Sequence, residues 1–150
     1  LMDCLLNKTI PSATNGTIIF KPRRKTFING LTYNYAIHYD KQLQNVIEEK
    51  VFMKVMEELM DLLYMAWPCC LCFSFGYLCC LCTLGMSFIC PGCQVVKAKE
   101  VMLEQIEAIN YKHFSDKGLK LSYQSNCLTS WLQLNIDQNV CLEHIRLTTM

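Results

Sequence analysis

Charge is scarce in this sequence. Only 18% of its 150 residues are charged, below the roughly 25% typical of a soluble domain. Lys and Arg together number 14 and Asp and Glu 13, so the chain lacks the basic excess of nucleic-acid-binding proteins. Apolar residues make up 52%, which excludes a disordered chain. The length provides for one folded domain.

Motifs of catalysis are also absent. The sequence contains no Gly-x-Ser-x-Gly, no phosphate-binding loop and no paired-carboxylate constellation, and these are the patterns that nucleophilic, phosphoryl-transfer and acid–base chemistry require. We therefore expect a protein that is not an enzyme and that uses no cofactor.

One stretch lacks charge altogether: residues 62–96 contain no Asp, Glu, Lys or Arg. A helical membrane span needs about 20 apolar residues, and two spans need about 40. Pro68 and Pro91 enclose 22 residues, which would reach about 33 Å as a helix. The stretch thus fits one span, or two half-depth helices bent at Gly76 or Gly85. Basic residues are balanced on its two sides, so the positive-inside rule does not orient it. We expect a re-entrant or interfacial hairpin.

Alternating residues predict strands on both sides of this stretch. Residues 31–39 place aromatic and aliphatic side chains at every second position, the pattern of a half-buried strand. Residues 18–20 are a short apolar run. Residues 119–123 and 132–136 alternate in the same way, and the intervening Gln124, Ser125 and Asn126 are typical of a turn.

Helical periodicity appears at residues 40–67 and 94–114. The residues expected to be buried are Phe52, Val55, Met56, Leu59 and Leu63 on the first helix and Val95, Ala98, Met102, Ile106 and Ile109 on the second. We predict an α+β fold, with a small antiparallel sheet and two amphipathic helices flanking a Cys-rich apolar membrane hairpin. Its divisions are an N-terminal arm (1–26), a central domain (27–141) with a membrane-embedded segment (62–96), and a C-terminal tail (142–150).

Eight of the eleven cysteines fall within residues 69–93, a crowding that indicates a reducing compartment and not a disulfide scaffold. Three Cys-x-x-Cys pairs raise the possibility of zinc, but a tetrathiolate site carries net charge −2, which is costly among apolar neighbours. Redox chemistry needs a nearby cation to lower the thiol pKa, and this stretch has none. S-acylation at a membrane surface fits best, with the remaining thiols packing as small apolar groups. The candidate lipidation sites are Cys79, Cys80, Cys82, Cys69, Cys70 and Cys72.

Residues 77–87 resemble the core of the cysteine-rich hydrophobic-domain proteins. They are more distantly similar to golgin subfamily A member seven and its fungal relatives, the accessory subunits of Ras palmitoyltransferase. Cys79 and Cys82, followed by Thr83, match that family's Cys-x-x-Cys before Thr. The resemblance covers about residues 27–136. Downstream of its cysteines the family has an Asn, then an aromatic residue, then Gly-Leu at the start of a strand, a motif for the fold or for partner binding. Asn110, Phe114, Gly118 and Leu119 match it in that order.

The resemblance implies a membrane protein on the cytosolic face of Golgi, vesicle or plasma membranes, itself S-acylated and acting in protein transport. It would bind and stabilise an integral-membrane palmitoyltransferase. The chain has no Asp-His-His-Cys sequence, so transfer chemistry would belong to that partner. Two other hypotheses remain: a structural subunit embedded in a membrane complex unrelated to acylation, and a soluble metal-binding protein.

Overall fold

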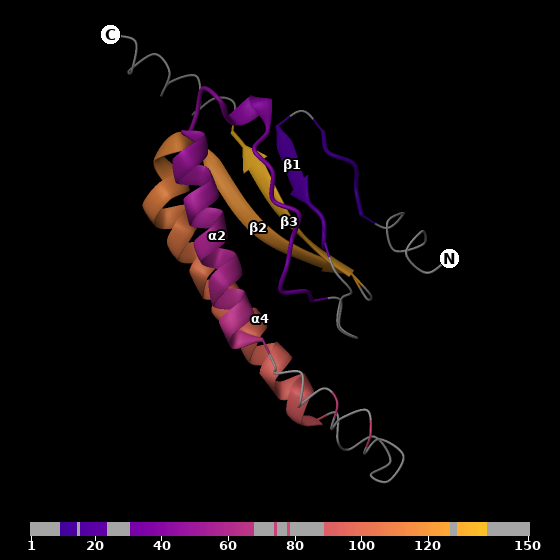
Figure 1. Cartoon of the computed structure of the whole chain (residues 1–150). Helices are drawn as coiled ribbons and strands as arrows, with labels where there is room; N and C mark the ends of the chain where they lie inside the picture. Colours follow the sequence, from indigo (N-terminus) through magenta and orange to yellow (C-terminus); the bar gives the residue numbers. More distant parts are fainter. Residues whose placement is uncertain are drawn as a thin grey trace.

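The computed structural model describes residues 10–14, 16–23, 31–67, 74, 78, 89–126 and 129–137. Within them the fold is α+β, as predicted: an antiparallel pair of helices packs on one side of a three-stranded antiparallel sheet (Figure 1). The elements, in chain order, are β1 (Thr17–Phe20), η1 (Lys41–Leu43), α2 (Glu49–Ala66), α4 (Ile89–Ile109), η3 (Asn110–Phe114), η4 (Ser115–Lys117), β2 (Leu119–Asn126) and β3 (Thr129–Ile136).

The sheet has the order β1-β3-β2, with β3 in the centre. The prediction of a C-terminal strand–loop–strand unit is confirmed, because β2 and β3 pair along their whole length. The predicted turn at residues 124–126 is wrong. Pairing continues to Asn126 and Thr129, because Gln124, Ser125 and Asn126 extend β2 as exposed positions beyond the core. Only residues 127 and 128 separate the two strands.

The strand predicted at residues 31–39 is also wrong, since the third strand of the sheet is β1. Residues 31–40 run extended beside the end of β1 and, among the described residues, form one isolated bridge, Pro22 with Tyr35. Two backbone hydrogen bonds flank this bridge: the Arg23 amide donates to the Asn34 carbonyl at 2.9 Å, and the Ala36 amide donates to the Lys21 carbonyl at 2.8 Å. The predicted inward positions hold in part: Leu31 and Tyr35 are buried, and Tyr33, Ile37 and Tyr39 are partly buried. Thr32, on the face expected to be exposed, is buried as well. Strand β1 itself lies within residues 1–26, the expected arm, and contributes Phe20 to the core.

The first helix begins later than predicted, at Glu49 and not at residue 40. A separate 3-10 turn precedes it, because the Asp40 side chain accepts a hydrogen bond from the Gln42 amide at 2.9 Å. The carbonyl of Ile47 accepts from the Tyr39 hydroxyl at 2.6 Å instead of joining a helical ladder. The buried stripe of α2 is the predicted one, Phe52, Val55, Met56, Leu59 and Leu63.

The second helix, α4, begins at Ile89, before the predicted residue 94. Its five predicted inward residues, from Val95 to Ile109, are all buried. At Asn110 the helix widens into a single π-turn, in which the Ser115 amide donates to the carbonyl of Asn110. Gly118 then ends the helical region with φ 66°, a left-handed conformation that glycine adopts without steric cost.

Phe52 joins the layers of the molecule. Its ring lies 6.2 Å from Phe20 of β1, 5.9 Å from Tyr39 and 6.3 Å from Phe114, between centroids. Helices, sheet and extended segment therefore share one hydrophobic core, which also contains Leu132 and Leu134 of β3. Away from this core, the end of the helical pair formed by Ala66 and Ile89 extends beyond the sheet (Figure 1).

Candidate functional site

The exposed end of the α2–α4 pair, residues 62–67 and 89–96, carries no charged residue. We call this end the hairpin tip. On α2 the last charged residue is Asp61, and on α4 the first is Lys97. Large apolar side chains between these limits are exposed, with Met65 79% and Val96 53% accessible. Leu78, which follows in the chain, is also 79% accessible. Isolated exposed apolar residues are ordinary, but a contiguous group of them marks a protein or membrane contact.

The two helices of the tip have unequal lengths. Phe52, near the start of α2, stacks on Phe114, just after α4, and the helices run antiparallel (Figure 1). With ~1.5 Å per helical residue, Trp67 at the end of α2 lies about level with Ala98 of α4. The charge-free residues 89–96 therefore carry α4 about 12 Å further. The tip is thus an uncharged helical projection.

Three aromatic side chains gather where the charges end. The ring of Tyr33, from the extended segment, lies 5.7 Å from Tyr64 and 5.4 Å from Trp67, between centroids. Tyr64 is 66% accessible, while Tyr33 and Trp67 are half-buried against the core. We call these three residues the aromatic collar. Tyr and Trp combine an apolar ring with a polar group, the chemistry of a membrane–water interface.

A second feature lies at the other end of α4, where Asn110 binds the edge of the sheet. Its Nδ2 donates to the Leu121 carbonyl and its Oδ1 accepts from the Leu121 amide, each at 2.7 Å. Strand β2 is an edge strand, and an unpaired edge invites association with other chains. Asn110 pairs both backbone groups of Leu121 as a neighbouring strand would.

The other motif residues lie beside this contact. Phe114 is fully buried, and its ring stacks on the ring of Phe52. Gly118 supplies the left-handed turn, and its carbonyl accepts from the Asp137 amide at 2.7 Å. Leu119 opens β2 and is buried. The structure therefore brings all four predicted motif residues to one region, in which Asn110 contacts β2 and Phe114 contacts α2.

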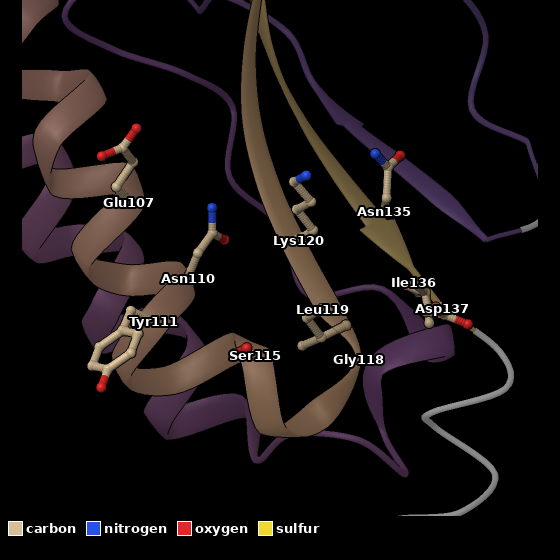
Figure 2. A pocket seen from close by; sticks show the side chains of 10 residues that line it. All are labelled: Glu107, Asn110, Tyr111, Ser115, Gly118, Leu119, Lys120, Asn135, Ile136 and Asp137. Carbon is tan, nitrogen blue, oxygen red and sulfur yellow. The ribbon is translucent and has the colours of Figure 1, made fainter.

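A hollow of about 730 Å³ adjoins the Asn110 contact. Figure 2 shows Asn110 projecting from the helical turn toward β2, with Glu107 on the preceding turn and Lys120 on the strand. The remaining lining residues are Tyr111, Ser115, Gly118, Leu119, Asn135, Ile136 and Asp137. The lining carries both signs of charge, so it offers polar and charged contacts.

The six candidate lipidation cysteines, at positions 69, 70, 72, 79, 80 and 82, lie outside the described residues, as do the suggested bends at Gly76 and Gly85. Cys93 is exposed on α4. In the described ranges, no three His, Cys, Asp or Glu side chains are grouped so that they could hold a metal ion. No helix in this part of the chain is long and apolar enough to cross a membrane.

The aromatic collar was not anticipated from the sequence. Tyr33 belonged to a presumed strand, and Trp67 marked a helix end, so nothing joined them. The available signal was position: Tyr64 and Trp67 stand just past Asp61, the last charge before the apolar stretch. No feature of the sequence predicted the hollow, because its lining residues come from separate parts of the chain. Comparisons of the chain with protein-family models, curated proteins and solved structures find no match.

Proposed function

We propose that this chain is a non-catalytic, S-acylated accessory subunit that binds and stabilises an integral-membrane protein acyltransferase. It would belong to the type represented by cysteine-rich hydrophobic-domain proteins and golgin subfamily A member seven. It would act on the cytosolic face of Golgi, vesicle or plasma membranes, in protein transport. Acyl transfer itself would take place in the partner.

The observation that carries the membrane part of this proposal is the packing of α2 against α4. The described ends of the charge-free stretch, residues 62–67 of the α2 end and 89–96 of the α4 start, lie at the same end of the helical pair (Figure 1). This arrangement favours a segment that enters and leaves a bilayer on one side, because a single span would place Phe52 and Phe114, which stack at 6.3 Å, on opposite sides of the membrane.

The motif residues support the family resemblance on which the partner part rests. Asn110, Phe114, Gly118 and Leu119 were matched by order alone, and the fold gives each a coherent place at one junction. A family motif whose members cooperate in one junction is consistent with a shared fold. The functional link to acylation rests on the resemblance.

Purification from membranes tests the proposal. We expect the full chain, tagged and extracted in mild detergent, to recover a palmitoyltransferase that mass spectrometry identifies, and co-expression to raise the steady-state level of that enzyme. Met65→Glu places a charge on an exposed apolar position of the tip and should reduce recovery. Val51→Glu, at an exposed apolar position near the start of α2 and away from the tip and the hollow, is the matched control and should not.

Two other results would contradict the proposed function. Reproducible recovery of a membrane complex that contains no acyltransferase would replace this proposal with the structural-subunit hypothesis. Stoichiometric zinc in the purified protein, together with its absence from membranes, would favour the soluble metal-binding hypothesis.

A further inference from the structure

We propose that the aromatic collar of Tyr33, Tyr64 and Trp67 lies in the headgroup region of a phospholipid bilayer and sets the depth at which the hairpin tip enters. This inference rests on the membrane association in the proposed function and adds to it a defined contact surface, with phospholipid as the ligand.

The first argument is position. The collar stands where the polar surface of the helices gives way to the uncharged tip: Asp61 precedes it on α2 and Lys97 is near its level on α4. About 12 Å of uncharged α4 lies beyond it. Amphipathic helices bury their apolar faces about 5–10 Å into the boundary between headgroups and acyl chains. A tip that enters by this amount brings the collar to the headgroups.

The second argument is chemistry. Tyr and Trp concentrate at membrane interfaces because the ring prefers the apolar side and the hydroxyl or indole N–H prefers the polar side. Lys97 is exposed close to this level, and a lysine there can extend its ammonium group to lipid phosphates. Lys99 faces the sheet instead, with its Nζ 5.4 Å from the centre of the Tyr123 ring.

The third argument is the anchoring of the collar to the fold. Tyr33 comes from the extended segment next to β1, whereas Tyr64 and Trp67 come from the end of α2. Contacts of 5.7 and 5.4 Å between ring centroids join the two segments, and Tyr33 and Trp67 pack against the core. Because the collar is fixed to the core, its depth also fixes the height of the sheet above the membrane.

Tryptophan fluorescence can measure this depth, because the chain has only two tryptophans. Trp131→Phe leaves Trp67 as the single reporter. The buried indole N–H of Trp131 has no hydrogen-bond acceptor among the described residues, so within them this substitution removes no hydrogen bond. The full chain would be reconstituted in vesicles of phosphatidylcholine with a minor fraction of phosphatidylserine. Lipids brominated near the headgroup or near the terminal methyl serve as quenchers.

We expect Trp67 to be quenched more strongly by shallow than by deep bromines. The control reporter is Tyr111→Trp in a chain with both natural tryptophans replaced by Phe, and it should be quenched by neither lipid. Tyr64→Glu should weaken vesicle binding about tenfold, since it removes the burial of about 60 Å² of apolar surface. Tyr111→Glu should leave binding unchanged.

Two results would overturn the inference. If the protein floats with vesicles but Trp67 is not quenched, the collar faces protein or water, and the proposed function stands without it. Stronger quenching by deep bromines would place the collar in hydrocarbon, not at the headgroups. If the unmodified chain fails to float, the inference and the membrane part of the proposed function both fall, whereas recovery of an acyltransferase is scored separately.

Discussion

The hydroxyl oxygens of Tyr35 and Ser130 lie 2.8 Å apart and share a buried hydrogen bond. Tyr35 belongs to the extended segment and Ser130 to the central strand β3. This side-chain bond therefore joins the sheet to a segment for which the described residues show one bridge, Pro22 with Tyr35. Tyr35 is 2% accessible. The segment that carries Tyr33 of the collar is thus held in place by a buried tyrosine two residues away.

Substitution of Tyr35 should reveal how much this contact contributes. Tyr35→Phe removes one hydrogen bond and should lower the free energy of unfolding by about 0.5–1.5 kcal/mol. Tyr35→Asp would bury an unpaired carboxylate and should cost about 3–5 kcal/mol. Urea denaturation followed by circular dichroism measures both. Tyr111→Asp, at an exposed site, should change stability by less than about 0.5 kcal/mol. Equal stability of Tyr35→Asp and the unmodified chain would exclude a core position.

Tyr35 should also make the fold sensitive to alkali. Burial is the main cause that raises the pKa of Tyr35 well above its ordinary value, because the phenolate is poorly solvated inside the protein. The unfolded chain, with a tyrosine pKa of about 10, loses this proton more readily than the folded chain. Stability from Tyr35 is therefore complete below pH 10 and is lost as pH rises above it. Denaturation at successive pH values should show a smaller loss in Tyr35→Phe; identical pH profiles would contradict the prediction.

The sequence predicted the helical faces well because helical burial repeats in the chain itself. All ten residues expected on the two buried stripes are buried. It failed at residues 31–39 because alternation reports which side chains face inward, not whether the backbone has a pairing partner. Leu31 and Tyr35 face inward as expected, but Thr32 is buried too, and within the described residues the segment meets its neighbour at one isolated bridge, Pro22 with Tyr35.

The sites could be predicted less well. Asn110 reaches Leu121 only because a π-turn and a left-handed glycine return the chain over eleven residues. The order of the motif residues indicated that they belonged together, but not which groups they contact. The aromatic collar is more difficult to predict, because Tyr33 contacts Tyr64 and Trp67 only in the tertiary fold. No local periodicity in the sequence indicates such a contact.

Removal of the Asn110 amide should loosen the edge of the sheet. Asn110→Ala leaves the N–H and C=O of Leu121 without their side-chain partner and should cost about 2–4 kcal/mol. Hydrogen exchange at the Leu121 amide should accelerate more than exchange at amides in the middle of α2. Tyr111→Ala changes the neighbouring, exposed residue and should leave both measurements unaltered. Unchanged protection of Leu121 in Asn110→Ala would show that this bond is dispensable.

The packing of α2 on α4 predicts the topology. Epitope tags inserted at Thr14 and Asp137, both exposed, should lie on the same, cytosolic side of the membrane. After selective permeabilisation of the plasma membrane, antibodies should reach both tags. A tag within the lumen of an organelle needs permeabilisation of that membrane as well. Tags on opposite sides would establish a single span, which is incompatible with the contact between Phe52 and Phe114.

Lipid attachment gives the most direct chemical test. Cys79, Cys80 and Cys82 form the tightest cysteine cluster and include the matched Cys-x-x-Cys pair, so at least one should carry a thioester-linked acyl chain. Neutral hydroxylamine cleaves a thioester, whereas a free thiol or a zinc ligand has no acyl group to release.

Changing these three cysteines to Ser should remove most incorporation of a fatty-acid analogue. Peripheral attachment should weaken, because each buried CH₂ of an acyl chain contributes about 0.8 kcal/mol. The uncharged tip should still retain part of the protein on membranes. Cys93→Ser, which changes an exposed cysteine of α4 outside the proposed set, should leave labelling unaltered. Full labelling of the triple variant would transfer the site to Cys69, Cys70 and Cys72. Absence of label from the unmodified chain would contradict acylation, and the thiols would then be metal ligands or small packed side chains.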